Sequence, residues 1–193
     1  RVRMSMEERV RHLFGMQIET KMAVADALSD SIAKAGQRLV NCLLSDGTIF
    51  IAGNGASSAN CLHFSSAMLN HFEVERPPLP VINLCADPIC LSSFANEHHY
   101  AQVFARQIQA LGQEQDVLIM LTTSGNSDSL IQALQAANER GMDTIVLSGK
   151  DGGILANHLG PEDIELRVLS DNAARIRELH LFFLHCFCDL IDQ

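Results

Sequence analysis

The sequence predicts an α/β protein: a three-layer, doubly wound, five-stranded parallel sheet that follows an N-terminal helical hairpin. Short apolar runs alternate along the chain with segments of helical periodicity. The runs are continuously apolar, as in strands that helices cover on both faces. The connections between them are long enough to hold helices, which is the length needed to join parallel strands. Together these observations indicate a doubly wound fold.

Residues 6–46 predict the helical hairpin. Apolar residues recur at helical spacing from Met6 over roughly the first half of this segment. The side chains of Ser29-Asp30-Ser31 are of the kind that caps helices, so a second helix is expected to start there and to run through Leu44. We expect this hairpin to pack on the core and on neighbouring subunits.

Residues 47–193 are expected to form the sheet and its covering helices, as one structural unit with the hairpin. Strands are predicted at 48–52, 80–84, 116–121, 143–148 and 163–168. Helices are predicted at about 57–71, 100–111, 127–140 and 152–158, with a long terminal helix from about Ala173. In such a sheet, ligands bind beyond the carboxyl ends of the strands.

Composition excludes several classes of protein. The formal net charge of −9 argues against nucleic-acid binding as the main activity, because phosphate backbones are held by basic patches. No apolar run approaches the ~20 residues that span a bilayer, so no membrane partner is expected. The six cysteines lie in apolar stretches without a CxxC pair. This pattern indicates buried thiols in a reducing cytoplasm rather than a disulfide framework or a zinc site.

Two turns rich in Gly, Ser and Thr carry the functional signal. One spans residues 53–58 after the first predicted strand, and the other spans 122–127 after the third. Small residues and hydroxyls at such turns let backbone N–H groups approach an anion, and the N-terminus of the next helix adds a partial positive charge. Ser and Thr also cap helices without any ligand. Two turns of the same chemistry nevertheless predict binding of a phosphorylated small molecule.

Four further motifs accompany the two turns: Glu75-Arg76-Pro77, Ala95-Asn96, Lys150-Asp151-Gly152-Gly153 and Ala174-Arg175-Ile176. Together they resemble the sugar isomerase (SIS) domain family, and within it the phosphoheptose isomerase branch, over nearly the whole chain. The resemblance implies the SIS fold, a homotetramer with active sites shared between subunits, and a sugar phosphate ligand. It carries phosphosugar binding onto the residues of the two turns, namely Asn54, Gly55, Ser57, Thr122, Thr123, Ser124 and Ser127.

The resemblance also shows two departures at the catalytic positions. Phosphoheptose isomerases have a Glu four residues after a His on the helix that follows the first turn. Here the His is His63, and Ala67 occupies the position of the Glu. The same branch has a Gln and a His eight residues apart on the last helix, and their counterparts are Arg177 and His185. Moving a carbonyl between two sugar carbons needs a base and an acid, and Ala67 supplies neither.

No metal or other cofactor is therefore expected. A guanidinium at position 177 would repel a metal ion. His63 and His185 remain the candidate metal ligands, and zinc enters only on the isomerase interpretation. If the chain is an enzyme, His185 or one of two carboxylates, Glu97 and Glu178, is the candidate catalytic group.

The residues of the two turns that are expected to bind the phosphate are called here the cradle. A chain that keeps the cradle but lacks the catalytic Glu resembles the DnaA initiator-associating proteins, which are SIS-domain relatives. Three segments fit that group: residues 73–77, 159–163 and 188–192. The first hypothesis is therefore a non-catalytic homotetramer that promotes replication initiation by binding DnaA, without binding nucleic acid itself. The alternatives are a phosphoheptose isomerase acting on sedoheptulose 7-phosphate, and a sugar-phosphate sensor.

Overall fold

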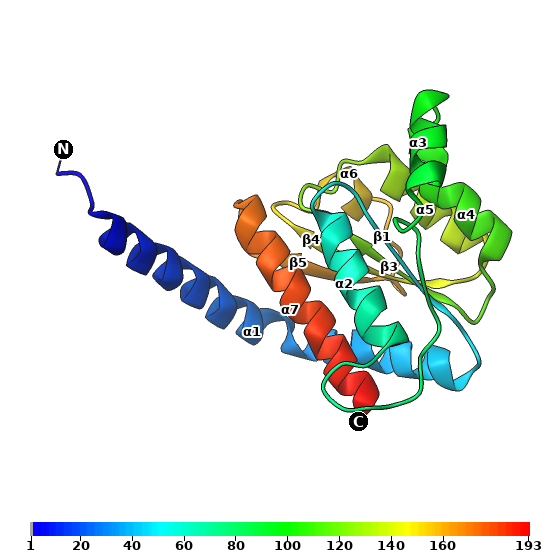
Figure 1. Ribbon diagram of the computed structural model, residues 1–193, viewed down its shortest axis with the longest axis horizontal. Coiled ribbons are helices and arrows are strands. Elements are labelled where there is room, and N and C mark those ends of the chain that lie inside the picture. The colour runs from blue at the N-terminus through cyan, green and yellow to red at the C-terminus, as the bar shows by residue number, and fades with distance from the viewer. Residues whose placement is uncertain (1) are drawn as a thin grey trace.

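Five parallel strands form one sheet in the computed structural model, which describes residues 2–193 (Figure 1). The strands are β1 (Ile49–Gly53), β2 (Val81–Asn83), β3 (Val117–Leu121), β4 (Asp143–Gly149) and β5 (Ile164–Val168). Their order across the sheet is β2-β1-β3-β4-β5. Every residue of β1 and β3 is buried, as expected for strands that helices cover on both faces. The predicted doubly wound parallel sheet is confirmed.

Helices cover both faces of the sheet. They are α1 (Met6–Leu44), α2 (Ser57–Leu69), α3 (Pro88–Asn96), α4 (Val103–Leu111), α5 (Asp128–Glu139), α6 (Gly153–Ala156) and α7 (Ala173–Asp192), with a short 3-10 helix η1 (Tyr100–Gln102). Contacts join α1 and α2 to α7 in one layer and α4 to α5 in the other. No helix among residues 2–193 is long and apolar enough to cross a membrane.

The N-terminal segment is one continuous helix, so the predicted break at residues 29–31 is wrong. The 39-residue helix α1 passes through this segment without interruption. The hydroxyl of Ser29 donates to the carbonyl oxygen of Ala25 at 2.5 Å, four residues back. Serine in a helix interior satisfies its hydroxyl in this way, although the same residue type also caps helix starts. The local sequence therefore allowed both structures.

The first half of α1 extends away from the rest of the chain (Figure 1). Five apolar side chains on it are exposed at four-residue spacing: Met6, Val10, Phe14, Ile18 and Met22. Residues four apart lie on the same face of a helix, so these side chains form one stripe, called here the α1 stripe. The second half of α1 packs on α7 and contributes Leu39 and Cys42 to the core.

The loop after β2 contains a helix that the sequence prediction missed. Helix α3 begins where the carboxylate of Asp87 accepts hydrogen bonds from the backbone N–H groups of Ile89 and Cys90, both at 3.0 Å. Pro88 occupies the first turn, where its missing N–H costs nothing. A capping Asp before Pro was the local signal for this helix.

The order of the strands places both Gly/Ser turns at one point. Strand β1 lies between β2 and β3, so the chain winds in opposite directions from β1 and leaves a crevice at the carboxyl end of these strands. Gly53, the last residue of β1, pairs with Leu121, the last residue of β3. The two turns therefore begin side by side.

Candidate functional site

The first turn is fixed in place through Asn54. Its side-chain amide donates to Ser129 Oγ of α5 at 2.9 Å, and the hydroxyl of Tyr100 donates to Asn54 Oδ1 at 2.6 Å. Gly55 has a φ of +54°, in the left-handed region that glycine adopts without strain. These contacts tie the first turn both to the helix that follows the second turn and to η1.

The second turn is closed by its own hydroxyls. Thr122 Oγ1 accepts from the backbone N–H of Gly125 at 2.9 Å, and Ser124 Oγ accepts from that of Asn126 at 3.3 Å. Both hydroxyls keep their own proton for donation, and a phosphate oxygen is an acceptor. Gly125 has a φ of +75°, and a Cβ there would collide with the carbonyl oxygen of Gly152. Glycine is therefore required at this position.

The helices that follow the two turns start without side-chain caps. Neither Ala56 before α2 nor Ser127 before α5 has a side-chain hydrogen bond to its helix. Side chains of Ser5, Asp87 and Asn172 do cap α1, α3 and α7. At α2, the N–H groups of Ser57 and Ser58 donate to the carbonyl oxygens of Asn54 and Gly55, both at 3.0 Å. The first N–H groups of α5 have no intrahelical partner, and an anion is a natural one. The side chain of Ser127 therefore does not cap α5.

His63 of α2 and His185 of α7 face each other. Their Nε2 atoms are 3.0 Å apart, and their rings meet edge to face with centroids 5.1 Å apart. One turn earlier on α2, the Asn60 side chain donates to the carbonyl oxygen of Arg177 at 3.1 Å. At this separation one Nε2 donates and the other accepts, so the pair can exchange a proton.

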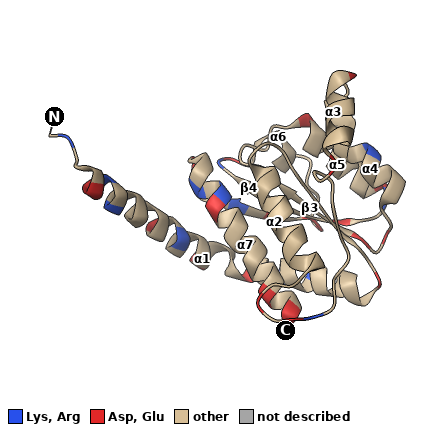
Figure 2. Ribbon diagram, in the orientation of Figure 1, with Lys and Arg blue, Asp and Glu red and all other residues tan. Residues whose placement is uncertain are grey.

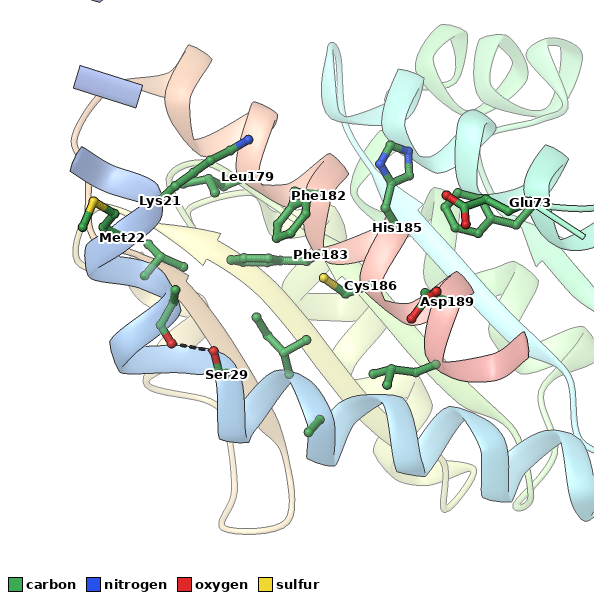
Figure 3. Close-up of a pocket in the computed structure, with 16 residues that line it drawn as sticks. Lys21, Met22, Ser29, Glu73, Leu179, Phe182, Phe183, His185, Cys186 and Asp189 are labelled. Atoms are coloured by element: carbon green, nitrogen blue, oxygen red, sulfur yellow. Dashed lines mark hydrogen bonds between the residues drawn. The ribbon is translucent and has the colours of Figure 1, made fainter. Parts of the chain in front are cut away.

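Burial, followed by the neighbouring His63, lowers the pKa of His185, while Glu73 acts in the opposite direction. The ring of Phe72 packs against His185 with centroids 5.5 Å apart. Glu73 and His185 line the same groove between α1, α7 and the loop after α2 (Figure 3). The lowered pKa keeps His185 neutral at pH 7, which is the form that accepts a proton.

The positions of the two missing catalytic residues hold groups that cannot replace them. Ala67 lies four residues after His63, on the same face of α2, and is largely buried. Arg177 belongs to the basic first turns of α7 that are visible in Figure 2. Its charge contributes to the lowered pKa of His180, after burial as the main cause.

The side chains of one chain do not fit a metal centre. Among residues 2–193, no group of three or more His, Cys, Asp or Glu side chains is placed to hold a metal ion. His63 and His185 would offer two nitrogen ligands, whereas Ala67 offers none. The guanidinium of Arg177 would oppose a cation.

The carboxylate that acts on His185 is Glu73, and not either of the two candidates. Glu178 lies 3.5 Å from Arg175 in an ion pair and its side chain is half exposed. Glu97 is the exposed residue that ends α3. Sequence analysis did not single out Glu73 or Tyr100 as site residues. Their proximity to His185 and Asn54 depends on how the loops after α2 and α3 fold back, which no local pattern encodes.

Comparison with known proteins identifies the family. Residues 15–149 match the family model of the SIS domain. The chain is 50% identical over 190 residues to the phosphoheptose isomerase of Halorhodospira halophila, covering 98% of this chain and 96% of that protein. It is 48% identical to the phosphoheptose isomerase of Alkalilimnicola ehrlichii, covering 98% of this chain and 97% of that protein. The phosphoheptose isomerase structure from Francisella tularensis superposes with a TM-score of 0.94 at 43% identity, covering 98% and 100% of the two chains.

The chain therefore belongs to the SIS domain family. The similarity extends over nearly the full length of both sequences in each pair. Within the family, this similarity assigns the chain to the phosphoheptose isomerase branch.

The first functional hypothesis, a non-catalytic protein that binds the replication initiator DnaA, is wrong. Relatives that are 46–50% identical over 97–98% of the chain are named phosphoheptose isomerase. Solved structures from Francisella tularensis and Neisseria gonorrhoeae, with TM-scores of 0.94 and 0.91, carry the same name. The loss of one catalytic carboxylate does not outweigh the similarity of the rest of the chain. The names of these relatives support the isomerase alternative instead.

Proposed function

We propose that this chain is a phosphoheptose isomerase that interconverts sedoheptulose 7-phosphate and its aldose isomer. The observation that carries the proposal is its 46–50% identity, over 97–98% of its length, to proteins of that name. Its cysteines are all free, which supports a cytoplasmic location, where thiols stay reduced.

The cradle formed by the two turns would hold the phosphate group. Hydroxyls of Ser57, Thr122, Ser124 and Ser127 and the uncapped N-terminus of α5 supply donors without a cationic side chain. A neutral cradle of this kind binds a sugar phosphate and also releases it. His63 follows Ser57 by six residues, about 9 Å along the helix axis. An extended seven-carbon sugar phosphate spans a comparable distance, so its carbonyl end would lie near the histidine pair.

Proton transfer would fall to His63 and His185, because Ala67 has no proton to exchange. A base removes a proton from C1 of the ketose while the C2 carbonyl oxygen gains one, which gives an enediol. A proton is then returned to C2 and the hydroxyl of C1 loses its own, which leaves an aldehyde. The neutral His185 can act as the base, and the Nε2 of His63 can take or return the proton.

The test is a turnover assay on purified protein with sedoheptulose 7-phosphate. We expect conversion clearly above the buffer rate, with the same rate before and after treatment with EDTA, because the donor set does not fit a metal ion. A rate that rises when zinc is added would support the proposed isomerase function but contradict the metal-free interpretation of the site. A rate equal to that of buffer under both conditions would overturn the proposed function.

We also propose that the chain assembles as a homotetramer, as its resemblance to the family implies. The exposed α1 stripe and the apolar groove of about 890 Å³ beside it support this, since association would remove both from water. Light scattering at micromolar concentration is expected to give four times the chain mass. Replacing Phe14 and Ile18 by Asp should lower that mass. His12→Asp, exposed on the opposite side of α1, should not. A monomer mass for the unmodified protein would contradict the proposal.

A further inference from the structure

Two thiols lie behind the first turn of the cradle, where β1 ends. Cys85, just after β2, donates its Sγ–H to the carbonyl oxygen of Gly53 at 3.0 Å. Cys61, one helical turn after Ser57 on α2, has its Sγ 3.3 Å from the position that a Cβ on Gly53 would occupy. The two sulfur atoms therefore lie against the same residue.

The packing of three elements brings these thiols together. Strand β2 runs beside β1, and the backbone N–H of Leu84 continues the pairing by donating to the carbonyl oxygen of Ile51 at 2.9 Å. Cys85 is the next residue and so comes level with Gly53. Helix α2 packs across both β1 and β2. The side chains of Cys61 and Cys85 therefore enter the same space between helix and sheet.

The two thiols differ in how readily they ionise. The neighbouring Cys85 thiol, followed by burial, raises the pKa of Cys61 well above its usual value. The thiol of Cys61 in turn lowers the pKa of Cys85. Cys85 also retains some exposure to solvent, at 9%, whereas Cys61 has none. Cys85 is therefore the thiol that a small oxidant reaches and that reacts as the thiolate.

Gly53 couples this thiol pair to the cradle. A Cβ at Gly53 would lie 3.1 Å from Ser57 Cβ, 3.2 Å from the carbonyl oxygen of Leu121 and 3.3 Å from Cys61 Sγ. Ser57, which we expect to bind the phosphate, thus contacts the same residue as Cys61 and lies one turn away from it on α2. Packing this tight does not absorb a shift of α2, so movement of Cys61 displaces Ser57.

We propose that Cys61 and Cys85 form a reversible disulfide when the protein meets a peroxide, and that this bond weakens phosphate binding at the cradle. The expected effect on phosphate binding rests on the anion-binding part of the proposed function and not on isomerase activity. A disulfide holds its sulfur atoms about 2 Å apart, well inside their non-bonded separation. Its formation must therefore draw α2 and the segment after β2 together, which moves the N-terminus of α2.

The reaction balances with a peroxide as the oxidant. The Cys85 thiolate attacks one peroxide oxygen, the O–O bond breaks, and Cys85 becomes a sulfenic acid. Cys61 sulfur then attacks the sulfur of Cys85, forming the S–S bond and releasing the sulfenic oxygen as water together with the Cys61 proton. Two thiols lose two electrons in total, and hydrogen peroxide is reduced to two molecules of water.

The test compares the full chain before and after hydrogen peroxide, with inorganic phosphate as the probe. Intact mass is expected to fall by two hydrogen atoms, and peptide mapping to link Cys61 with Cys85. Phosphate affinity, measured by calorimetry, should weaken by about tenfold and recover with dithiothreitol. Cys61→Ala and Cys85→Ser should each abolish both changes. Cys90→Ser, on α3, should retain them.

Three results would overturn the proposal. One is the absence of a Cys61–Cys85 link in oxidised wild-type protein. Another is a complete link with unchanged phosphate affinity. The third is a reduced protein that binds no phosphate, which would also remove the cradle from the proposed function. Absence of isomerase turnover alone, with phosphate binding intact, would leave the thiol proposal standing.

Discussion

His185→Asn is expected to lower kcat/KM for sedoheptulose 7-phosphate by about 10²–10⁴-fold, the contribution of one general acid–base group. Asparagine fills a similar space and keeps a hydrogen-bond donor for His63, but it does not accept a proton in this pH range. His63→Asn should lose activity in the same direction, because the two Nε2 atoms are 3.0 Å apart. Steady-state kinetics on each variant provides the measurement.

The pH profile separates this role from a structural one. Burial and the neighbouring His63 lower the pKa of His185, so its neutral form persists below the ordinary imidazole value. The acid limb of kcat/KM should therefore lie below that value, and His185→Asn should remove it. His158→Asn, at an exposed position after α6, is the matched control and should leave rate and profile unchanged. Unaltered turnover in His185→Asn would transfer the role of base to Glu97 or Glu178, whose Gln variants would then be inactive.

Arg76→Ala is expected to lower the free energy of unfolding by about 3–5 kcal/mol, the cost of leaving one partner of a buried ion pair alone. Arg76 Nε donates to Asp192 Oδ1 at 2.7 Å, and the two side chains are only 12% and 7% exposed. The guanidinium also donates to the carbonyl oxygens of Met68 at 2.9 Å and Ala67 at 3.0 Å. One side chain thus holds the end of α2 to the last turn of α7.

Urea unfolding of two further variants tests this explanation. Replacing Arg76 by Met and Asp192 by Leu together should recover most of the loss, because no buried charge remains. The exposed pair Arg11–Glu7 on α1 serves as a control, with side chains 78% and 76% exposed. Its Arg11→Ala variant should change stability by no more than about 0.5 kcal/mol. A loss for Arg76→Ala as small as that would contradict the buried-pair argument.

The sheet was predictable because its signals are local and repeated. Strands β1 to β4 each contain a short apolar run, and β5 alternates apolar residues with Glu165 and Arg167. These five segments predict one parallel sheet whatever the exact boundaries. Elements with competing local signals were harder to assign. Ser29 has the side chain of a cap but bonds back to Ala25 inside a continuous helix. Helix α3 has a cap at Asp87 but little hydrophobic periodicity, and it buries no residue.

The candidate site was predictable in composition but not in its contacts. The turns and both histidines follow from the sequence and its resemblance to a family. The approach of His63 to His185 depends on the packing of α2 on α7, between residues 122 positions apart. The same holds for Tyr100 on Asn54, 46 positions apart, and for Glu73 beside His185. Contacts of this range are set by the tertiary fold, which a pattern of neighbouring residues does not contain.

The packing of α1 on α7 has a consequence for how the chain is made. A Cβ on Gly36 would lie 2.6 Å from Leu190 Cδ1, so the middle of α1 is covered by a residue near the far end of the sequence. A ribosome adding about 5–20 residues per second leaves α1 without this cover for on the order of ten seconds. During that interval the second half of α1 lacks the helix on which it packs in the complete fold. A messenger truncated before the codon for Leu190 would therefore yield a product in which this part of α1 lacks its cover from α7.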